Sequence, residues 1–297
     1  MKRSNGEKIF NIFNIIFMIL LCVVMLYPYL NQIAISFNDG MDSMKGGITL
    51  LPRKFTLENY RSVFTSSDFT QSVIVSVARV ISSTLLSLLV VYSCAYGLTR
   101  KNLPYKRGLT LFLMIPAYIT AGVIPTYILY RYLGMINNFL VYILPGAFVF
   151  YNMVIIRSFL QEIPESIEES AQIDGANDIY IMFKIIMPLS MPVIATVSLW
   201  VAVGAWNDWT TTLMYVTKRE LFPLQYLMMR IIKESEAAQQ MAMQASMNKG
   251  SAATVSQPTS ESVKSATLIV TTIPIIMVYP FLQKYFIKGV ALGAVKG

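Results

Sequence analysis

Long apolar runs alternate with short polar segments along the chain. Runs of about 20 residues or more, the length that crosses a ~30 Å hydrocarbon core as an α-helix, cover residues 9–30, 69–98, 109–133, 139–160, 191–215 and 266–285. Each run must satisfy its own backbone hydrogen bonds in lipid, so we expect six transmembrane helices. Prolines within the runs predict kinks and close helix neighbours; among them are Pro116, Pro125, Pro274 and Pro280.

The composition agrees with this pattern. Of the 297 residues, 55% are hydrophobic and only 13% are charged, more apolar surface than a soluble domain of this length can bury. The chain is therefore expected to be an all-α integral membrane protein. Histidine is absent, and both cysteines, Cys22 and Cys94, lie within apolar runs, so neither a metal site nor a disulfide is expected.

The basic residues of the short connections predict the orientation. They are Lys2, Arg3 and Lys8 before the first run, Arg100, Lys101, Lys106 and Arg107 after the second, and Lys284 and Lys288 at the end. Since lysine and arginine collect on the cytoplasmic side, we expect a multi-pass protein of the cell membrane with both termini in the cytoplasm.

The first apolar run could be a secretory signal or a retained span. Its basic start is typical of a signal peptide, but Tyr27, Pro28 and Tyr29 stand where small residues would form a cleavage site. We therefore expect a retained first helix.

Two extracytoplasmic connections are long, residues 31–68 and 218–265. Within the second, residues 234–262 are rich in small and polar side chains, which predicts a segment that stays mobile until a partner orders it. An insertion without a role is the alternative.

An acidic, glycine-interrupted segment, EESAQIDGAND (168–178), separates the fourth and fifth runs on the cytoplasmic side. Pro164 suits a first helical turn, and Glu165, Glu168 and Glu169 follow it where negative charge favours a helix N-terminus. Gly175 is placed to end the helix, and Asn177 or Asp178 can cap the next one. From these features alone, the segment could be a capped surface helix without a specific role.

The spacing of this segment resembles the EAA signature of ABC importer permeases: E-A-A, three residues, G, nine residues, I-x-L-P. Here it reads E-S-A, Q-I-D, G and, nine residues later, I-I-M-P, with Ser170 and Met187 as departures. The resemblance implies a coupling helix, at about 163–178, that docks on an ATP-hydrolysing subunit. It assigns contact with this subunit to Glu169, Ser170, Ala171, Asp174, Gly175 and Ala176. The chain has no G-x-x-x-x-G-K-[ST] phosphate loop, so the ATPase must be a separate chain.

Further segments extend the resemblance over essentially the whole chain. They are FNDGMDSMKGGITLLPRKFTLENYRSVF, AYGLTRKNLPYKR, AWNDWTT and YPFLQKYFIKGVALGAVKG. They are similar to carbohydrate-uptake permeases of the maltose-importer type, particularly the Gram-positive branch that handles complex oligosaccharides. The resemblance implies a type I ABC importer permease fold with three parts: residues 1–68 with the first helix and loop, a core at 69–290, and a cytoplasmic tail at 291–297.

The same resemblance implies the partners. They are a homologous second permease, an ATP-binding cassette ATPase dimer, an extracellular lipid-anchored binding protein, a sugar and membrane lipid, with no nucleic acid. The chain itself is then not an enzyme and needs no cofactor, because ATP and magnesium bind the partner ATPase.

Aromatic and polar residues within the spans are candidates for the sugar path, because aromatic faces stack on sugar rings and amides or carboxylates bind hydroxyls. The main cluster is Trp206, Asn207, Asp208 and Trp209; Tyr118, Tyr127 and Asn152 are further candidates. The alternative is an aromatic belt at the membrane interface for the cluster and ordinary packing for the others.

Arg79 lies about nine residues into the second run, roughly 13 Å along a helix. A cation at that depth needs a partner, water or a route to the surface. It could bond a neighbouring helix, or it could line the path and hold the carboxylate of an acidic sugar in a two-pronged contact.

The predicted coupling helix distinguishes between the possible functions. The leading hypothesis is the membrane subunit of an ATP-driven sugar importer that works by alternating access. An ABC importer of another solute, such as an amino acid or polyamine, is the main alternative. A stand-alone secondary transporter has no use for a coupling helix, and a membrane enzyme lacks any cluster of catalytic side chains.

Overall fold

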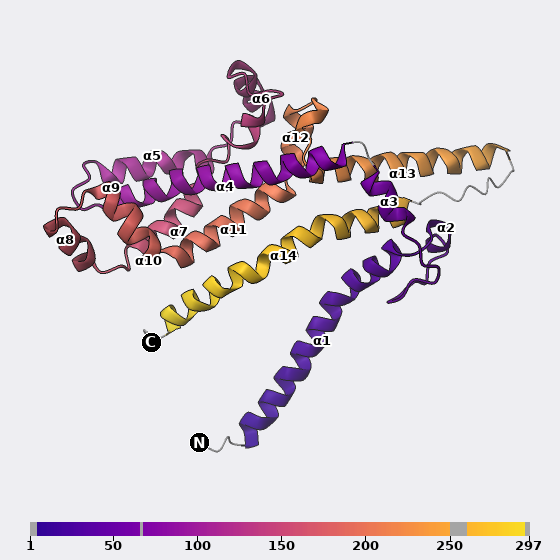
Figure 1. Ribbon diagram of the computed structural model, residues 1–297, viewed down its shortest axis with the longest axis horizontal. Helices are drawn as coiled ribbons and strands as arrows, with labels where there is room; N and C mark the ends of the chain where they lie inside the picture. The colour runs from indigo at the N-terminus through magenta and orange to yellow at the C-terminus, as the bar shows by residue number, and fades with distance from the viewer. Residues whose placement is uncertain (1–4, 66–67, 250–259, 295–297) are drawn as a thin grey trace. The chain divides into compact units, whose positions relative to one another are not determined.

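The computed structural model describes residues 5–65, 68–249 and 260–294. These residues are helical or irregular, with a single isolated β-bridge between Asn38 and Phe55 and no strand in the described ranges. The chain forms two units, Met1–Phe69 with Met228–Pro274 and Thr70–Leu227 with Ile275–Gly297. Figure 1 shows the helices that make up each unit. The all-α prediction is confirmed for the described residues.

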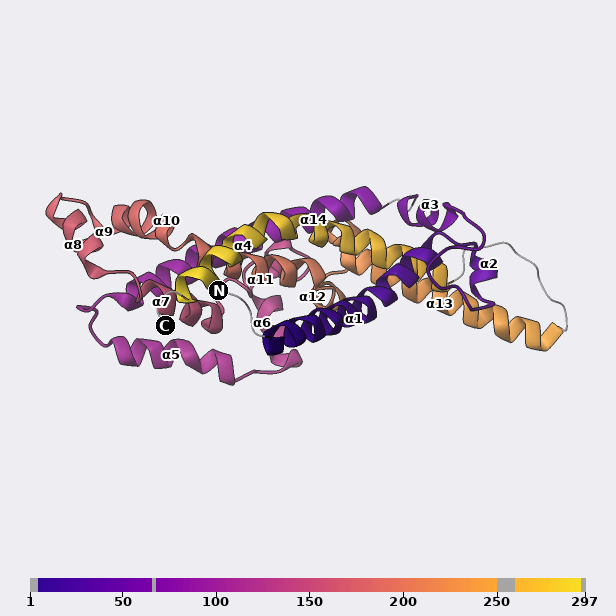
Figure 2. The same cartoon turned by 90° about the horizontal axis from the view of Figure 1, so that it is seen from below.

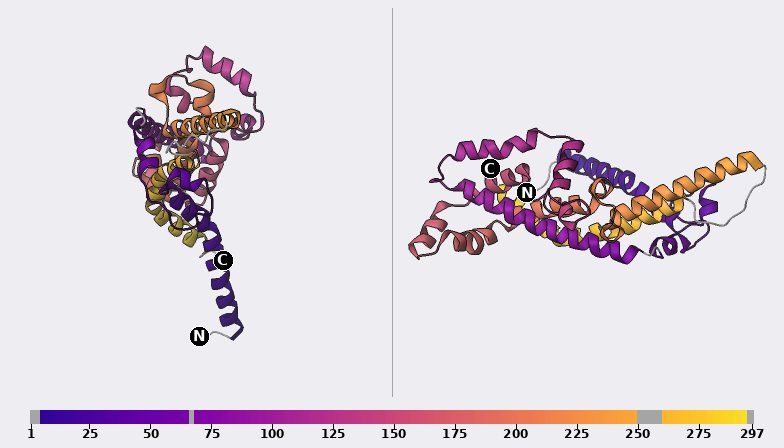
Figure 3. Two further views of the ribbon diagram at one scale, coloured as in Figure 1. Left: turned by 90° about the vertical axis from the view of Figure 1, so that its right-hand side faces the viewer. Right: turned by 90° about the horizontal axis from the view of Figure 1, so that it is seen from above.

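The first unit begins with α1 (Asn5–Ser36), seen as the continuous indigo helix in Figure 3. Its apolar span is not buried within the chain at all. Such a helix has its whole apolar surface free for lipid or for another protein. The unit continues with α2 (Gly40–Ser43) and α3 (Glu58–Phe64), which lie in the loop predicted at 31–68.

The second unit is built on α4 (Phe69–Thr99), a 31-residue helix that runs through the second apolar run. One face of α4 is buried and lined by small polar residues near its start and by larger side chains near its end. The later part packs with α7 (Phe150–Leu160) and α11 (Met191–Asn207) in one hydrophobic core. Central core side chains, all buried, are Tyr92, Met153, Ile156, Ile181 and Val197.

The third apolar run is not one straight helix. It forms α5 (Lys106–Tyr118) and α6 (Val123–Tyr132), which meet at 113° (Figure 1). The break falls at 119–122, where Gly122 has φ +82°. Glycine adopts that backbone conformation without strain. The run has the length of a span. We predicted a single kinked helix over 109–133, whereas the structure has two helices with a non-helical break between them.

The fourth run is also interrupted, and the predicted helix over 139–160 is wrong in its first half. A 3₁₀ turn, η1 (Phe139–Tyr142), is followed by a tight turn in which the Ala147 amide donates to the Leu144 carbonyl. Pro145 and Gly146 are the central residues of this turn, a pair that favours turns whatever the hydropathy around it. Only α7 (Phe150–Leu160) continues as an α-helix.

The stretch between the fourth and fifth runs is a series of short helices. These are α8 (Glu165–Ile173), α9 (Asp178–Tyr180), the π-helical turn η2 (Ile181–Ile186) and α10 (Met187–Leu189). Helices α8, α9 and α10 lie together in both Figures 1 and 2. The segment Asp178–Leu189 then meets α11 at 85°, with Ser190 at the bend. The helix before Gly175 and the capped helix after it, both expected from the sequence, are present.

Helix α11 ends at Asn207, and α12 (Thr210–Tyr215) follows after a two-residue break. A 3₁₀ turn, η3 (Arg219–Leu221), leads into α13 (Leu224–Lys249). Residues 234–249, the first part of the segment 234–262 predicted to stay mobile until a partner orders it, form a helix. The alanine, glutamine and methionine residues of this part all form helices readily. Residues 250–259 lie outside the described ranges, and α14 (Ser260–Ala294) follows them.

Among the described residues, two helices are long and apolar enough to cross a membrane, and four spans result if each bent pair counts as one. Six spans remain a prediction. Of the expected tail at 291–297, residues 291–294 continue α14, and the rest lies outside the described residues.

Candidate functional site

Helix α8 coincides with the acidic segment found in the sequence. Its nine residues begin after Pro164 and end at Ile173. Gly175 then has φ +82°; its amide donates to the Gln172 carbonyl at 3.0 Å, and the Ala176 amide donates to the Ala171 carbonyl at 3.0 Å. This pair of bonds is a Schellman motif, in which the glycine occupies the left-handed position after the helix. The predicted helix stop at Gly175 is confirmed.

The next helix is capped by Asn177, whose side-chain oxygen accepts a hydrogen bond from the Tyr180 amide at 2.8 Å. The chain continues through the π-helical turn to the buried Ser190 at the bend. The Ser190 hydroxyl contacts the Ile186 carbonyl at 2.9 Å and the Tyr92 hydroxyl of α4 at 3.3 Å. The bend is thus tied to α4 by a polar contact inside the core.

Two acidic residues of α8, Glu165 and Glu168, form ion pairs with the basic connection that follows α4. Glu168 forms an ion pair with Arg100, the residue that follows α4. Arg100 also reaches Asp178, with 3.3 Å between Nη2 and Oδ1, and its guanidinium lies 4.2 Å from the centre of the Tyr96 ring. Arg100 therefore joins three elements: the end of α4, α8 and the start of α9.

A second ion pair, between Lys101 and Glu165, lies beside the first and raises the pKa of Lys101. It is exposed to solvent, so it contributes little to stability. A polar pocket of about 810 Å³ lies between the α4–α5 connection and α8. Its wall includes both ion pairs and also Lys106, Glu169 and Gln172.

The six residues predicted to contact a partner ATPase lie as follows. Ala171 is buried and faces the core, while Ala176 is half-buried. The other four, Glu169, Ser170, Asp174 and Gly175, are exposed on α8 and its turn, with Glu169 also bordering the pocket. Ile173 accompanies them with 86% of its side chain exposed.

Arg79 and Asp208 come together, although the sequence analysis considered them separately. Arg79 is 3% exposed; its Nη1 donates to the Asp208 backbone carbonyl at 2.7 Å, and its Nη2 forms an ion pair with the Asp208 carboxylate. The guanidinium also lies 4.5 Å from the centre of the Tyr142 ring. Of the two accounts of Arg79, this geometry favours the bond to a neighbouring helix.

The cluster of residues 206–209 spans the end of α11 and the two-residue break before α12. Asp208 holds the break, because its Oδ1 accepts from the amides of Thr210 and Thr211 at 3.0 and 3.1 Å. Asn207 is exposed, and Trp206 and Trp209 are half-buried. Trp206 and the Asn207 amide are therefore carried by the last turn of α11, and Trp209 by the break that Asp208 fixes.

The remaining candidates are dispersed. Tyr118 at the end of α5 is 79% exposed, and Tyr127 on α6 stacks on Tyr215, with ring centres 6.1 Å apart. Asn152 is buried in α7. The structure does not bring these three residues into one site with the Trp206–Trp209 cluster.

An aromatic pair was missed by the sequence analysis. Tyr151 on α7 and Trp200 on α11 stack with ring centres 6.0 Å apart and ring planes at 26°, yet they remain 61% and 44% exposed. Gly204, one turn after Trp200, has open space where a side chain would stand, and Asn207 follows on the same face. No local pattern in the sequence links residues 151 and 200. The role of Arg100 as an ion-pair partner of α8, in contrast, could have been predicted, because Arg100 lies in a basic connection and α8 in an acidic one, both predicted to be cytoplasmic.

The fold and this site define a helical membrane protein in which a short acidic surface helix, α8, connects the core helices α7 and α11. Residues 99–292 match the family described as binding-protein-dependent transport system inner membrane component. The chain belongs to this family. It is thus an inner membrane component of a transport system, as the predicted permease role requires.

Curated relatives cover nearly the full chain. The polygalacturonan/rhamnogalacturonan transport system permease protein YtcP of Bacillus subtilis (strain 168) is 36% identical over 95% of this chain and 96% of its own length. Protein LplC of the same organism is 32% identical over 100% and 98%. The arabinooligosaccharides transport system permease protein AraQ of Halalkalibacterium halodurans is 28% identical over 92% of both chains.

A solved structure is similar over almost the same extent. It is the crystal structure of a bacterial ABC transporter involved in the import of the acidic polysaccharide alginate, with a TM-score of 0.81, 28% identity, and coverage of 96% of this chain and 99% of the other. The resemblance to ABC importer permeases of the sugar-uptake type is confirmed by these comparisons.

Proposed function

We propose that this chain is one of two permease subunits of an ATP-driven importer that moves an oligosaccharide, delivered by an extracellular binding protein, across the cell membrane. Both termini then lie in the cytoplasm, and ATP with magnesium binds a separate ATPase dimer. The relatives' names support a sugar: YtcP is named for polygalacturonan and rhamnogalacturonan, AraQ is named for arabinooligosaccharides, and the similar solved transporter is involved in alginate import.

The single observation that carries the coupling role is the division of α8 into two faces. Its inner face is fixed to the core by Ala171 and to α4 by the Glu168–Arg100 ion pair. Its exposed surface presents Glu169, at the rim of the pocket beside the α4–α5 connection, and Ile173 beside the Gly175 turn. A helix held on one side and free on the other can transmit a push from a docked ATPase to the membrane helices.

The translocation path that we propose runs along the exposed face of α7 and α11. The exposed face of α4 consists of aliphatic residues, among them Ile74, Ile81 and Leu85, as expected for a surface toward lipid. The exposed face of α11 instead carries Trp200, Gly204 and Asn207. An aromatic ring, an open backbone and an amide suit a sugar better than a lipid tail.

Acidic oligosaccharides are the first substrates to test, because YtcP and the alginate transporter are named for uronate-containing polymers. In this proposal Arg79 does not supply the charge that binds the acid, since Asp208 already occupies its guanidinium. The net charge of +8 on this chain is compatible with an anionic cargo but does not specify one.

The test is purification through a tag on this chain, followed by reconstitution with the co-purified subunits and binding protein. We expect an ATPase in the complex and ATP-dependent uptake of an oligogalacturonide. Replacement of Glu169 by lysine should remove the ATPase and abolish uptake, while Glu162→Lys, an exposed charge outside α8, serves as the control. Uptake of an amino acid or polyamine instead of any sugar would contradict the substrate, and transport without ATPase would contradict the class.

A further inference from the structure

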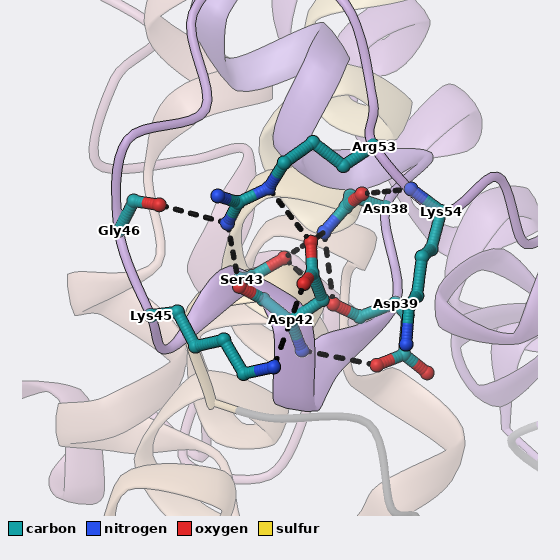
Figure 4. Close-up of polar contacts among 8 residues, drawn as sticks. All are labelled: Asn38, Asp39, Asp42, Ser43, Lys45, Gly46, Arg53 and Lys54. Carbon is teal, nitrogen blue, oxygen red and sulfur yellow. Dashed lines mark hydrogen bonds and ion pairs between the residues drawn. The ribbon is translucent and has the colours of Figure 1, made fainter.

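The loop between α1 and α4 is ordered by a network of side-chain bonds around Asp42 (Figure 4). The buried Asp42 carboxylate accepts from the Asn38 amide at 3.2 Å and from Arg53 Nε at 2.9 Å. Arg53 also donates to the carbonyls of Asp42 and Gly46 at 3.0 and 2.8 Å. These bonds close the segment 42–53 into a fixed loop.

A second set of bonds fixes where this loop lies along α1. The Asn31 side chain donates to the carbonyls of Ile48 and Thr49 at 2.7 and 2.9 Å. Asn31 precedes the end of α1 at Ser36 by five residues, about 7.5 Å along the helix. The loop therefore folds back along α1 instead of extending away from its end.

The position of Asn31 has a consequence for the next residues. Asn31 is the first polar residue after the apolar run 9–30 that forms the proposed first span. Its level along α1 is thus the level at which the hydrocarbon core gives way to headgroups. Leu50 and Leu51 directly follow Thr49, so the loop carries two leucines to this depth.

The described part of the chain leaves more than half of each leucine exposed. Leu50 is 53% exposed and Leu51 is 78% exposed, although the backbone before them is hydrogen-bonded. Arg53 and Lys54 follow after Pro52; Arg53 is held by the Asp42 network, and Lys54 is exposed. Adjacent large apolar side chains at this level suit the boundary of a bilayer, where the hydrocarbon core gives way to the headgroup region.

We propose that this loop is a membrane-anchoring element: Leu50 and Leu51 insert into the outer leaflet beside the end of α1, and the Asp42 network holds them in that position. The occupant of this apolar surface is lipid and not another protein, because the Asn31 bonds place it at the depth where α1 leaves the membrane. The side of the membrane rests on the proposed topology, whereas the insertion itself does not depend on sugar transport.

The test uses the complete complex in vesicles of phosphatidylethanolamine and phosphatidylglycerol. Cys22 and Cys94 are replaced by alanine, and a nitroxide label is attached to Leu51→Cys or, in a second variant, to Leu50→Cys. Collision of the label with oxygen, which concentrates in lipid, is compared with collision with a water-soluble nickel chelate. Glu58→Cys, an exposed acidic position at the start of α3, is the aqueous control, and Val23→Cys on α1 is the reference in the apolar span.

We expect the labels at 50 and 51 to collide with oxygen several-fold more, relative to the chelate, than the label at 58. A ratio equal to that at 58 would place the loop in water and overturn the proposal. Low collision with both reagents would also overturn it, because it would show that a protein covers the leucines. If the complex does not take up sugar but the labels report lipid, the proposed function is contradicted, whereas the insertion of Leu50 and Leu51 into the membrane is supported.

Discussion

Arg79 and Asp208, which are 129 positions apart in the sequence, form an ion pair inside the second unit. The pair is asymmetric, because the Arg79 side chain is 4% exposed and that of Asp208 is 24% exposed. Asp208 simultaneously holds the amides of Thr210 and Thr211. One carboxylate thus fixes the break between α11 and α12 and attaches this break to α4.

We predict that Arg79→Gln destabilises the complex and lowers uptake of acidic and neutral oligosaccharides to the same extent. The loss of one partner of a buried ion pair typically costs about 3–5 kcal/mol, and the partial exposure of Asp208 places this case toward the lower end. Thermal unfolding of the purified complex and uptake of oligogalacturonide against arabino-oligosaccharide measure the two effects. Arg79→Lys, which keeps the charge, should be less harmful. A selective loss of acidic sugars with normal stability would return Arg79 to the sugar path.

The Arg100–Glu168 ion pair predicts a charge-exchange result. Arg100→Glu places two carboxylates in contact between α4 and α8 and should weaken ATPase retention and uptake. Glu168→Arg in the same chain restores opposite charges and should recover a large part of both. Pull-down of the ATPase and the number of ATP molecules hydrolysed per sugar are the measurements. If the double variant is as defective as the single ones, the contact does not position α8.

Replacement of Gly175 by valine tests the Schellman turn. A β-branched residue at φ +82° costs roughly 1–3 kcal/mol locally, and we expect the turn to change shape and the ATPase to dissociate more readily. Gly108→Val is the matched control, because Gly108 lies in α5 and also has open space around it. Both variants should insert into the membrane normally. Equal ATPase retention in the two would separate the glycine from coupling.

The stacked pair Tyr151 and Trp200 predicts a difference between two substitutions of one residue. Trp200→Phe keeps an aromatic face, whereas Trp200→Leu keeps apolar volume without the ring. If the ring stacks on sugar, the leucine variant should raise the apparent KM for uptake about three- to tenfold over the phenylalanine variant. Basal ATP hydrolysis should stay unchanged in both. Identical KM values would show that the pair serves only packing.

The loop after α1 should lose its order in acid. The hydrogen bond from the Asn38 amide is the largest cause that lowers the pKa of Asp42 below its usual value, and Arg53 adds to it. A carboxyl with a lowered pKa stabilises the folded loop at any pH above about 3.9, and this contribution disappears as the pH falls through the folded-state pKa. Hydrogen exchange of residues 38–56 between pH 5 and 3 should therefore accelerate beyond its intrinsic pH dependence. Asp42→Asn should show fast exchange already at pH 5.

The sequence predicted those features that depend on local rules. The stop at Gly175, the cap at Asn177 and the uninterrupted helices around the first two apolar runs follow from turn chemistry and hydropathy over a few residues. The breaks at Gly122 and at Pro145–Gly146 also carried local signals, but apolar length outweighed them in the analysis. For residues 234–249, polarity was interpreted as mobility although the helix propensities were high.

The pairings between distant residues could not be predicted in this way. Arg79 needed a partner, but no spacing rule selects Asp208 over the other carboxylates. Tyr151 and Trp200 meet because α7 and α11 pack side by side, and that packing depends on the complete core. The Asn31 bonds to Ile48 and Thr49 likewise depend on the path of a loop that no periodic pattern describes.

Helix α4 carries one ion pair in its first half and another just past its end. Arg79 and Arg100 are 21 positions apart, about 31 Å along a helix, which is close to the thickness of a hydrocarbon core. A helix of this length is stiff compared with the turns at either end. Helix α4 therefore links the surface helix α8 at one end to the break before α12 at the other. A displacement of α8 must then either move this break as well or break one of the two ion pairs.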